Sequence, residues 1–92
     1  MSRQPKHMDL VQVEWWDHSS RTDRGWYPLE SHKAEAAALK CISVGFVAHR
    51  DKDVTVIIPH VYVAEEGWQQ KGCGDMTLIN KAIHSIKILK RA

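Results

Sequence analysis

Two β-patterned stretches joined by a short polar turn limit the fold of this chain more than any other feature. One face of the first stretch, residues 41–50, carries the apolar side chains of Ile42, Val44, Phe46 and Ala48. Successive side chains of a strand point to opposite faces, so this alternation is typical of a strand. A second β-rich stretch, residues 54–63, follows the polar residues 51–53. The sequence therefore predicts a hairpin over residues 41–63.

Three residues indicate that this hairpin is bent. Gly45 lies in the middle of the first strand, where a glycine marks a bend, a bulge or a close approach of backbone. The alternation of the second strand shifts phase at Ile57, and Pro59 has no N–H to donate to a ladder. We therefore expect the second half of that strand to bend or to lie at an edge.

Further short elements surround the hairpin. Residues 10–16 alternate and predict a half-buried first strand, with Val11, Val13 and Trp15 on one face. Residues 76–79 and 85–89 predict two more strands, with Ile86 and Ile88 directed inward and one helical turn over residues 80–83 between the strands. Residues 31–40 are alanine-rich and begin with a candidate N-cap serine, so they form the one predicted helix.

Together these elements predict a mainly β domain with one short helix. Five short, bent strands favour a small closed barrel, because closure removes exposed strand edges. The helix is then inserted after the first strand, between Trp16 and Cys41. Residues 1–8 form a flexible arm in this prediction, and residues 9–92 form a single domain. A chain of this length buries only about two-thirds of its unfolded surface, so we also expect homo-oligomers.

Composition narrows the class of protein. The chain is 43% hydrophobic and 26% charged, which is ordinary for a globular domain and excludes a disordered chain. The two cysteines are far apart and form neither a disulfide framework nor a zinc-ribbon pattern. The longest apolar run, residues 54–63, is too short to span a membrane. These features predict a cytoplasmic protein with no membrane partner.

Two motifs resemble the signatures of Sm-like proteins. Gly45, Val47 and Asp51, followed by a hydrophobic strand, resemble the first signature, and residues 78–83 (LINKAI) resemble the second signature of the bacterial Sm-like RNA chaperones. The resemblance implies a small five-stranded barrel that forms a ring, with a nucleotide pocket around the pore. Carried over by position, that pocket involves Asp51, Asp53, Thr55 and Lys81. The chain departs from the family order because its first strand precedes the helix.

The whole chain also resembles a group of short, mostly uncharacterised tailed-phage proteins. The matching residues are Val13, Trp15, Asp17, Trp26, Ser43, Val44, Gly45, Phe46, Ile79, Asn80, Lys81, Ile83 and Ile86. This resemblance implies an origin in a phage and a location in the host cytoplasm, but it implies no activity.

Catalytic and metal-binding patterns are weak. The six histidines show neither helical i, i+4 spacing nor a clustered Cys/His pattern, so no metal site is predicted. His49 and His60 remain an alternative, as cross-strand neighbours that hold an adventitious metal. Residues 17–20 (DHSS) contain the residue types of a catalytic triad, but triads are defined by geometry and not by adjacency. We therefore predict that the protein is not an enzyme and uses no cofactor.

The four tryptophans are more than a thin core requires. Three of them, Trp16, Trp26 and Trp68, lie at or near predicted loops. They can close the open ends of a barrel, stack on a base with help from Lys71 and Lys81, or form a protein interface.

Two functions follow from these observations. The first is a non-catalytic, oligomeric module that binds a nucleotide or nucleic acid. It is supported by the basic residues near the C-terminus, which are Lys81, Lys87, Lys90 and Arg91. Its predicted ligand-binding residues are Asp51, Asp53, Thr55, Lys81, Trp16, Trp26 and Trp68. The alternative is a phage accessory protein that binds and modulates a host protein, such as a defence component.

Overall fold

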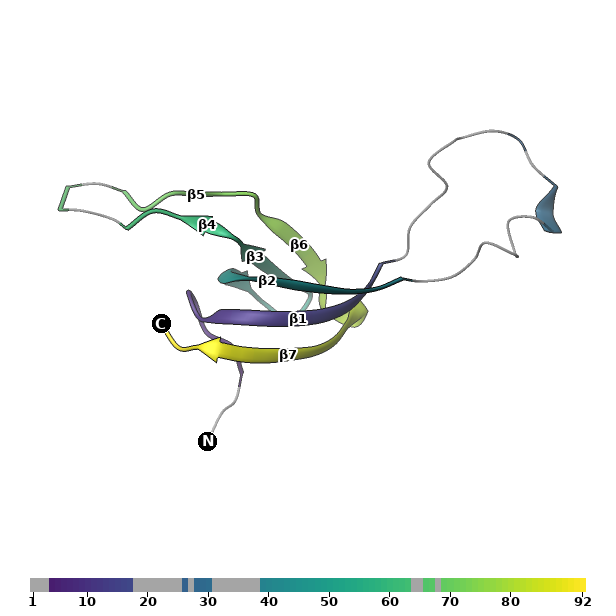
Figure 1. The fold of residues 1–92 in the computed structure, drawn as a ribbon, viewed down its shortest axis with the longest axis horizontal. Helices are drawn as coiled ribbons and strands as arrows, with labels where there is room; N and C mark the ends of the chain where they lie inside the picture. The colour runs from purple at the N-terminus through teal and green to yellow at the C-terminus, as the bar shows by residue number, and fades with distance from the viewer. Residues whose placement is uncertain (1–3, 18–25, 27, 31–38, 64–65, 68) are drawn as a thin grey trace.

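The chain forms an open antiparallel sheet of five strands, in the order β6-β3-β2-β1-β7 (Figure 1). The computed structural model describes residues 4–17, 26, 28–30, 39–63, 66–67 and 69–92. The strands of the sheet are β1 (Leu10–Asp17), β2 (Leu39–Arg50), β3 (Val54–Ile58), β6 (Met76–Ile79) and β7 (Ile83–Lys90). A separate two-stranded ribbon pairs β4 (His60–Val61) with β5 (Gly72–Cys73), and the 3-10 turn η1 (Asn80–Ala82) joins β6 to β7.

The predicted mainly β class is confirmed, but the sheet is not closed into a barrel. Strands β6 and β7 are the two edges of the sheet. The four residues of β6 pair only with β3. After β6, η1 turns the chain back, so that β7 pairs with β1 at the opposite edge. The predicted helix over residues 31–40 lies outside the described residues, except for Leu39 and Lys40, which belong to β2. Within the described part of the chain, no helix is long and apolar enough to cross a membrane.

The sequence predicts one strand over residues 54–63 that bends or lies at an edge in its second half, whereas the structure has two strands there, divided at Pro59. Strand β3 ends at Ile58, and the chain resumes as β4 at His60, which leaves the sheet to pair with β5. Strand β5 is a two-residue element inside a stretch that the sequence predicts as loop. A Cβ atom at Gly72 would lie 2.6 Å from the carbonyl oxygen of His60, so only glycine permits this close pairing.

The core is thin and lies on one face of the sheet. The buried apolar side chains are those of Val11, Val13, Val47, Ile57 and Leu78. Partly buried side chains that pack against them are those of Trp15, Ile83, Ile86 and Ile88, and the inward direction predicted for the two β7 isoleucines is therefore confirmed. The indole N–H of Trp15 donates a hydrogen bond of 3.0 Å to the hydroxyl of Ser43.

Strand β2 turns part of its most apolar face away from the core. Ile42 and Val44 are 62% and 48% exposed, whereas Val47 on the opposite face is buried. The pairing with β1 explains this orientation, since the core residue Val11 lies opposite Gly45. Small residues on the inner face of β2 leave the volume of the core to side chains from β1 and β7.

A buried carboxylate ties the two ends of the described chain to the sheet. The side chain of Asp9 accepts hydrogen bonds from the backbone N–H groups of Lys6 and Ala92, both at 2.9 Å, and from the guanidinium of Arg91 at 3.0 Å. The pKa of Asp9 is lowered, first by the Lys6 N–H and then by that of Ala92. The backbone N–H of Met8 also donates to the carbonyl of Val47 at 2.7 Å. Residues 6–9 therefore pack beside β2 and β7.

Candidate functional site

The turn between β2 and β3 is organised by the carboxylate of Asp51. This carboxylate accepts hydrogen bonds from the backbone N–H groups of Asp53 at 2.8 Å and Val54 at 2.9 Å. Its second oxygen lies 2.8 Å from Nε2 of His49. The hydrogen bond from His49, followed by those from Val54 and Asp53, lowers the pKa of Asp51 to about 2. Asp51 therefore stays ionised at neutral pH and holds the turn in one conformation.

Asn80, the first residue of η1, fastens this turn to the end of β6. Its side-chain amide donates to the carbonyl of Asp51 at 2.8 Å, and its backbone N–H donates to the carbonyl of Asp53, also at 2.8 Å. The hydroxyl of Thr55 completes the contact by donating to Oδ1 of Asn80 at 2.7 Å. Segments far apart in the sequence thus form one polar cluster.

Arg50 connects this polar cluster to a small cavity. Its guanidinium donates to the hydroxyl of Thr55 at 3.1 Å and to the side chain of Gln4 at 3.2 Å. The cavity has a volume of about 290 Å³ and is lined by Gln4, Pro5, Arg50, Asn80, Ile83, His84, Ser85 and Ile86. None of these residues is acidic, and within the described part of the chain no carboxylate pairs with Arg50. The cavity therefore offers one guanidinium and the hydrogen-bonding side chains of Asn80, His84 and Ser85 to an anion.

The residues predicted from the Sm-like signatures lie together, but their environments differ. Thr55 is fully buried, and its hydroxyl is shared between Arg50 and Asn80, so it supports the cavity wall and is closed to solvent. The carboxylate of Asp51 accepts hydrogen bonds from the backbone of its own turn. Asp53 and Lys81 are exposed at the rim of the cluster. The structure thus separates residues that shape the cluster from residues that face solvent.

The predicted aromatic residues are not gathered into one surface among the described residues. Trp16 is 39% exposed at the end of β1, a strand that contacts η1. Trp26 is fully exposed. Trp68 lies outside the described residues.

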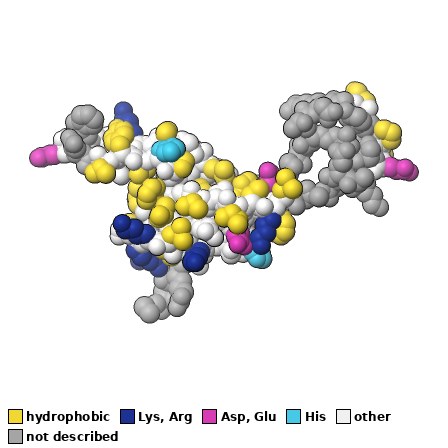
Figure 2. All heavy atoms as spheres, in the orientation of Figure 1, with side chains coloured by type: hydrophobic (Ala, Val, Ile, Leu, Met, Phe, Trp, Pro, Cys, Tyr) yellow, Lys and Arg dark blue, Asp and Glu magenta, His cyan; other side chains and the backbone are white. Residues whose placement is uncertain are grey.

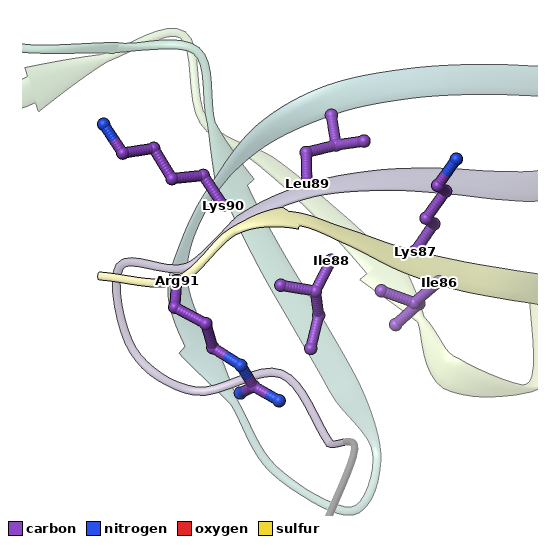
Figure 3. A pocket seen from close by; sticks show the side chains of 6 residues that line it. All are labelled: Ile86, Lys87, Ile88, Leu89, Lys90 and Arg91. Atoms are coloured by element: carbon purple, nitrogen blue, oxygen red, sulfur yellow. The ribbon is translucent and has the colours of Figure 1, made fainter.

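A basic strip follows the edge strand β7. Lys87, Leu89 and Lys90 project to one side of the strand, whereas Ile88 and Arg91 project to the other (Figure 3). These residues, with Ile86, line a cavity of about 560 Å³. Figure 2 shows Lys and Arg side chains gathered over this end of the sheet. Arg91 is engaged with Asp9, whereas no ion pair between described residues involves Lys87 or Lys90.

Sequence reasoning did not identify Arg50, Asn80 or His84 as site residues. They come from different elements, and the strand pattern carries no signal that they converge. The suggested pairing of His49 with His60 is wrong, because His49 lies opposite Val56 and His60 lies opposite Cys73.

Comparisons of the chain with protein-family models, with curated proteins and with solved structures found no match. The Sm-like and phage resemblances therefore stay predictions that rest on the sequence motifs.

Proposed function

We propose that this protein is a non-catalytic binding module whose Arg50 cavity takes a phosphate group of a nucleotide or nucleic acid. The observation that carries the proposal is a guanidinium with no described carboxylate partner in a cavity without acidic lining. Arginine binds phosphate through paired N–H groups in a fixed geometry. The hydrogen bonds to Thr55 and Gln4 orient the guanidinium before a ligand arrives.

Neighbouring groups fit the same ligand. His84 and Ser85, near the start of β7, line the cavity, and the exposed Lys81 follows the lining residue Asn80 in sequence. Trp16, the residue before the last of β1, is 39% exposed and offers a surface on which a base can stack. Lys87 and Lys90 extend the positive potential along β7, where further phosphates of a longer strand would be attracted. These groups favour a single-stranded nucleic acid over an isolated mononucleotide.

Arg50→Ala is expected to weaken binding of a fluorescein-labelled single-stranded RNA roughly tenfold, because it removes the only cation in the cavity lining. Fluorescence anisotropy measures the affinity, and a panel of cyclic nucleotides tests the smaller ligands. Lys52→Ala is the matched control, since it removes an exposed cation from the same turn but not from the cavity. An equal loss in both variants would contradict the cavity as the site, and no binding by the wild-type chain would remove the proposal.

Self-association is part of this proposal. The edges β6 and β7 leave backbone groups unpaired, and unprotected edges commonly pair with another chain. The two edges differ in charge, because Asp75 precedes β6 whereas Lys87 and Lys90 lie on β7. Head-to-tail pairing of β6 with β7 of a second copy therefore fits better than pairing of like edges.

The Sm-like assignment is supported by the one-turn helix η1 directly before β7.

Native mass spectrometry is expected to show an oligomer at micromolar concentration. Leu89→Lys and Ile79→Lys should shift it toward monomer, since both side chains are exposed on edge strands and are 44% and 61% accessible. Ile42→Lys is the comparison variant, because Ile42 is similarly exposed but lies on neither β6 nor β7. A monomeric wild type would contradict self-association. Loss of assembly in Ile42→Lys alone would place the contact on the outer face of β2 and not on the edges β6 and β7.

A further inference from the structure

The β4–β5 ribbon places a histidine directly opposite a cysteine. His60 and Cys73 are register partners in this antiparallel pair. Side chains of directly opposed residues lie on the same face of a ribbon, with Cβ atoms about 4.5–5.5 Å apart. Both residues line a cavity of about 330 Å³, together with Val61, Tyr62, Lys71 and Gly72. Cys73 is exposed and forms no disulfide. An imidazole and a thiol thus share one accessible hollow.

The ribbon holds this pair in a defined geometry. The backbone N–H of Tyr62 donates to the carbonyl of Lys71 at 3.2 Å, and the Tyr62 hydroxyl donates to the carbonyl of Gln69 at 3.1 Å. Gly72 lets the two strands approach closely at the next position, since a Cβ there would lie 2.6 Å from the carbonyl oxygen of His60. The His60 ring lies beside Gly74, because a Cβ at Gly74 would be 3.8 Å from its Cδ2 atom. These contacts fix the backbone on both sides of the pair.

We propose that His60 and Cys73 bind one Cu(I) ion. Thiolate is a soft ligand that selects Cu(I), and imidazole also suits copper. Structural zinc sites require four ligands, whereas Cu(I) is stable with two ligands in a linear arrangement. Among the described residues, no group of three or more His, Cys, Asp or Glu residues could hold a metal ion, so the described ligands of this site are His60 and Cys73. The coordination number of the site therefore favours Cu(I) over Zn²⁺.

The charge of the site favours the same ion. Binding releases the thiol proton of Cys73 and leaves His60 neutral, so a thiolate and Cu(I) form a neutral pair. Lys71 lines the same cavity, and its ammonium disfavours the extra positive charge that Zn²⁺ would leave. No redox step is involved, because the ion binds in the oxidation state in which it is supplied.

Anaerobic titration of the full chain with Cu(I), in competition with the chelator bicinchoninate, tests this site. The wild type is expected to bind one Cu(I) per chain. Cys73→Ser should lower the affinity roughly 100-fold, and His60→Gln roughly tenfold, because each removes one of two ligands. Cys41→Ser is the matched control, since Cys41 is the other free cysteine and lies on β2. It should leave the affinity unchanged.

Three results would overturn the proposal. They are the absence of Cu(I) binding by the wild type, unchanged binding by Cys73→Ser, and an equal loss in Cys41→Ser. A parallel titration with Zn²⁺ should show weaker binding, and equal or tighter binding of Zn²⁺ would refute the choice of metal. Circular dichroism spectra of all variants establish that the sheet is retained, so a loss of metal is not a loss of fold. RNA binding at the Arg50 cavity is measured separately and does not decide this test.

Discussion

Gly45→Ala is expected to lower the midpoint of thermal unfolding by roughly 10 °C, because it forces extra volume into a closely packed strand pair. A Cβ atom at this position would lie 3.1 Å from both the backbone nitrogen and the backbone oxygen of Ile58, and 3.2 Å from Cβ of Ile57. These atoms are not the far ends of flexible side chains. The strands must therefore move apart if the methyl group is to fit.

Such a movement is costly at this place in the sheet. Phe46, the next residue, pairs with Ile58 in the β2–β3 ladder, and Ile57 is a buried core residue at 2% exposure. The buried apolar core is small, so the separation of β2 from β3 opens much of it to water. Gly45→Ala should therefore destabilise the whole domain, and the unfolding midpoints measured by different probes should shift together.

Gly67→Ala is the matched control for this prediction. Gly67 has a φ of +83°, a conformation that alanine rarely adopts, but nothing lies within 4 Å of a Cβ placed there. The substitution should cost about 1 kcal/mol through backbone strain alone. Thermal unfolding followed by far-ultraviolet circular dichroism compares the two variants. Equal shifts would show that the separation of β2 from β3 costs no more than the backbone strain at Gly67, and a stabilised Gly45→Ala protein would show that the separation has no cost.

The strands were predictable because their signal is local. Period-two alternation marks β1 and β7, and Pro59 marks the end of β3, since proline lacks a ladder donor. The buried face of β2 was not predictable in the same way. One face of β2 carries Ile42 and Val44, and the other carries Gly45 and Val47. Apolarity alone favours the first face as the buried one, whereas the second face is buried. The choice depends on the register with β1, which is a contact between distant segments.

The candidate site was predictable only in part, for the same reason. The Sm-like signatures select Asp51, Thr55 and Lys81, but they do not distinguish a buried hydroxyl from an exposed ammonium. The cavity depends on Arg50 at the end of β2 and His84 in β7, which meet only after the sheet forms. Strand β5 is too short to produce a period, so the pairing of His60 with Cys73 leaves no local pattern.

Thr55→Val is expected to weaken RNA binding roughly tenfold and also to lower thermal stability, because one buried hydroxyl serves both the site and the fold. The hydroxyl accepts from Arg50 at 3.1 Å and donates to Asn80 at 2.7 Å, and the side chain is fully buried. Valine has nearly the same shape but offers neither hydrogen bond. Oδ1 of Asn80, at a part-buried contact, loses its donor, and the loss of such a hydrogen bond costs about 0.5–1.5 kcal/mol.

The same substitution at Thr77 separates these effects from a general change in β propensity. Thr77 lies on β6 with an exposed side chain, so Thr77→Val should leave both affinity and the unfolding midpoint nearly unchanged. Anisotropy titrations and thermal unfolding are measured on both variants. If Thr55→Val unfolds at a lower temperature but binds RNA as the wild type does, the orientation of Arg50 does not determine affinity. The guanidinium would then act only as a point charge, and the Arg50→Lys variant should bind RNA as well as the wild type does. If the orientation of the guanidinium does matter, the Arg50→Lys variant should bind RNA more weakly.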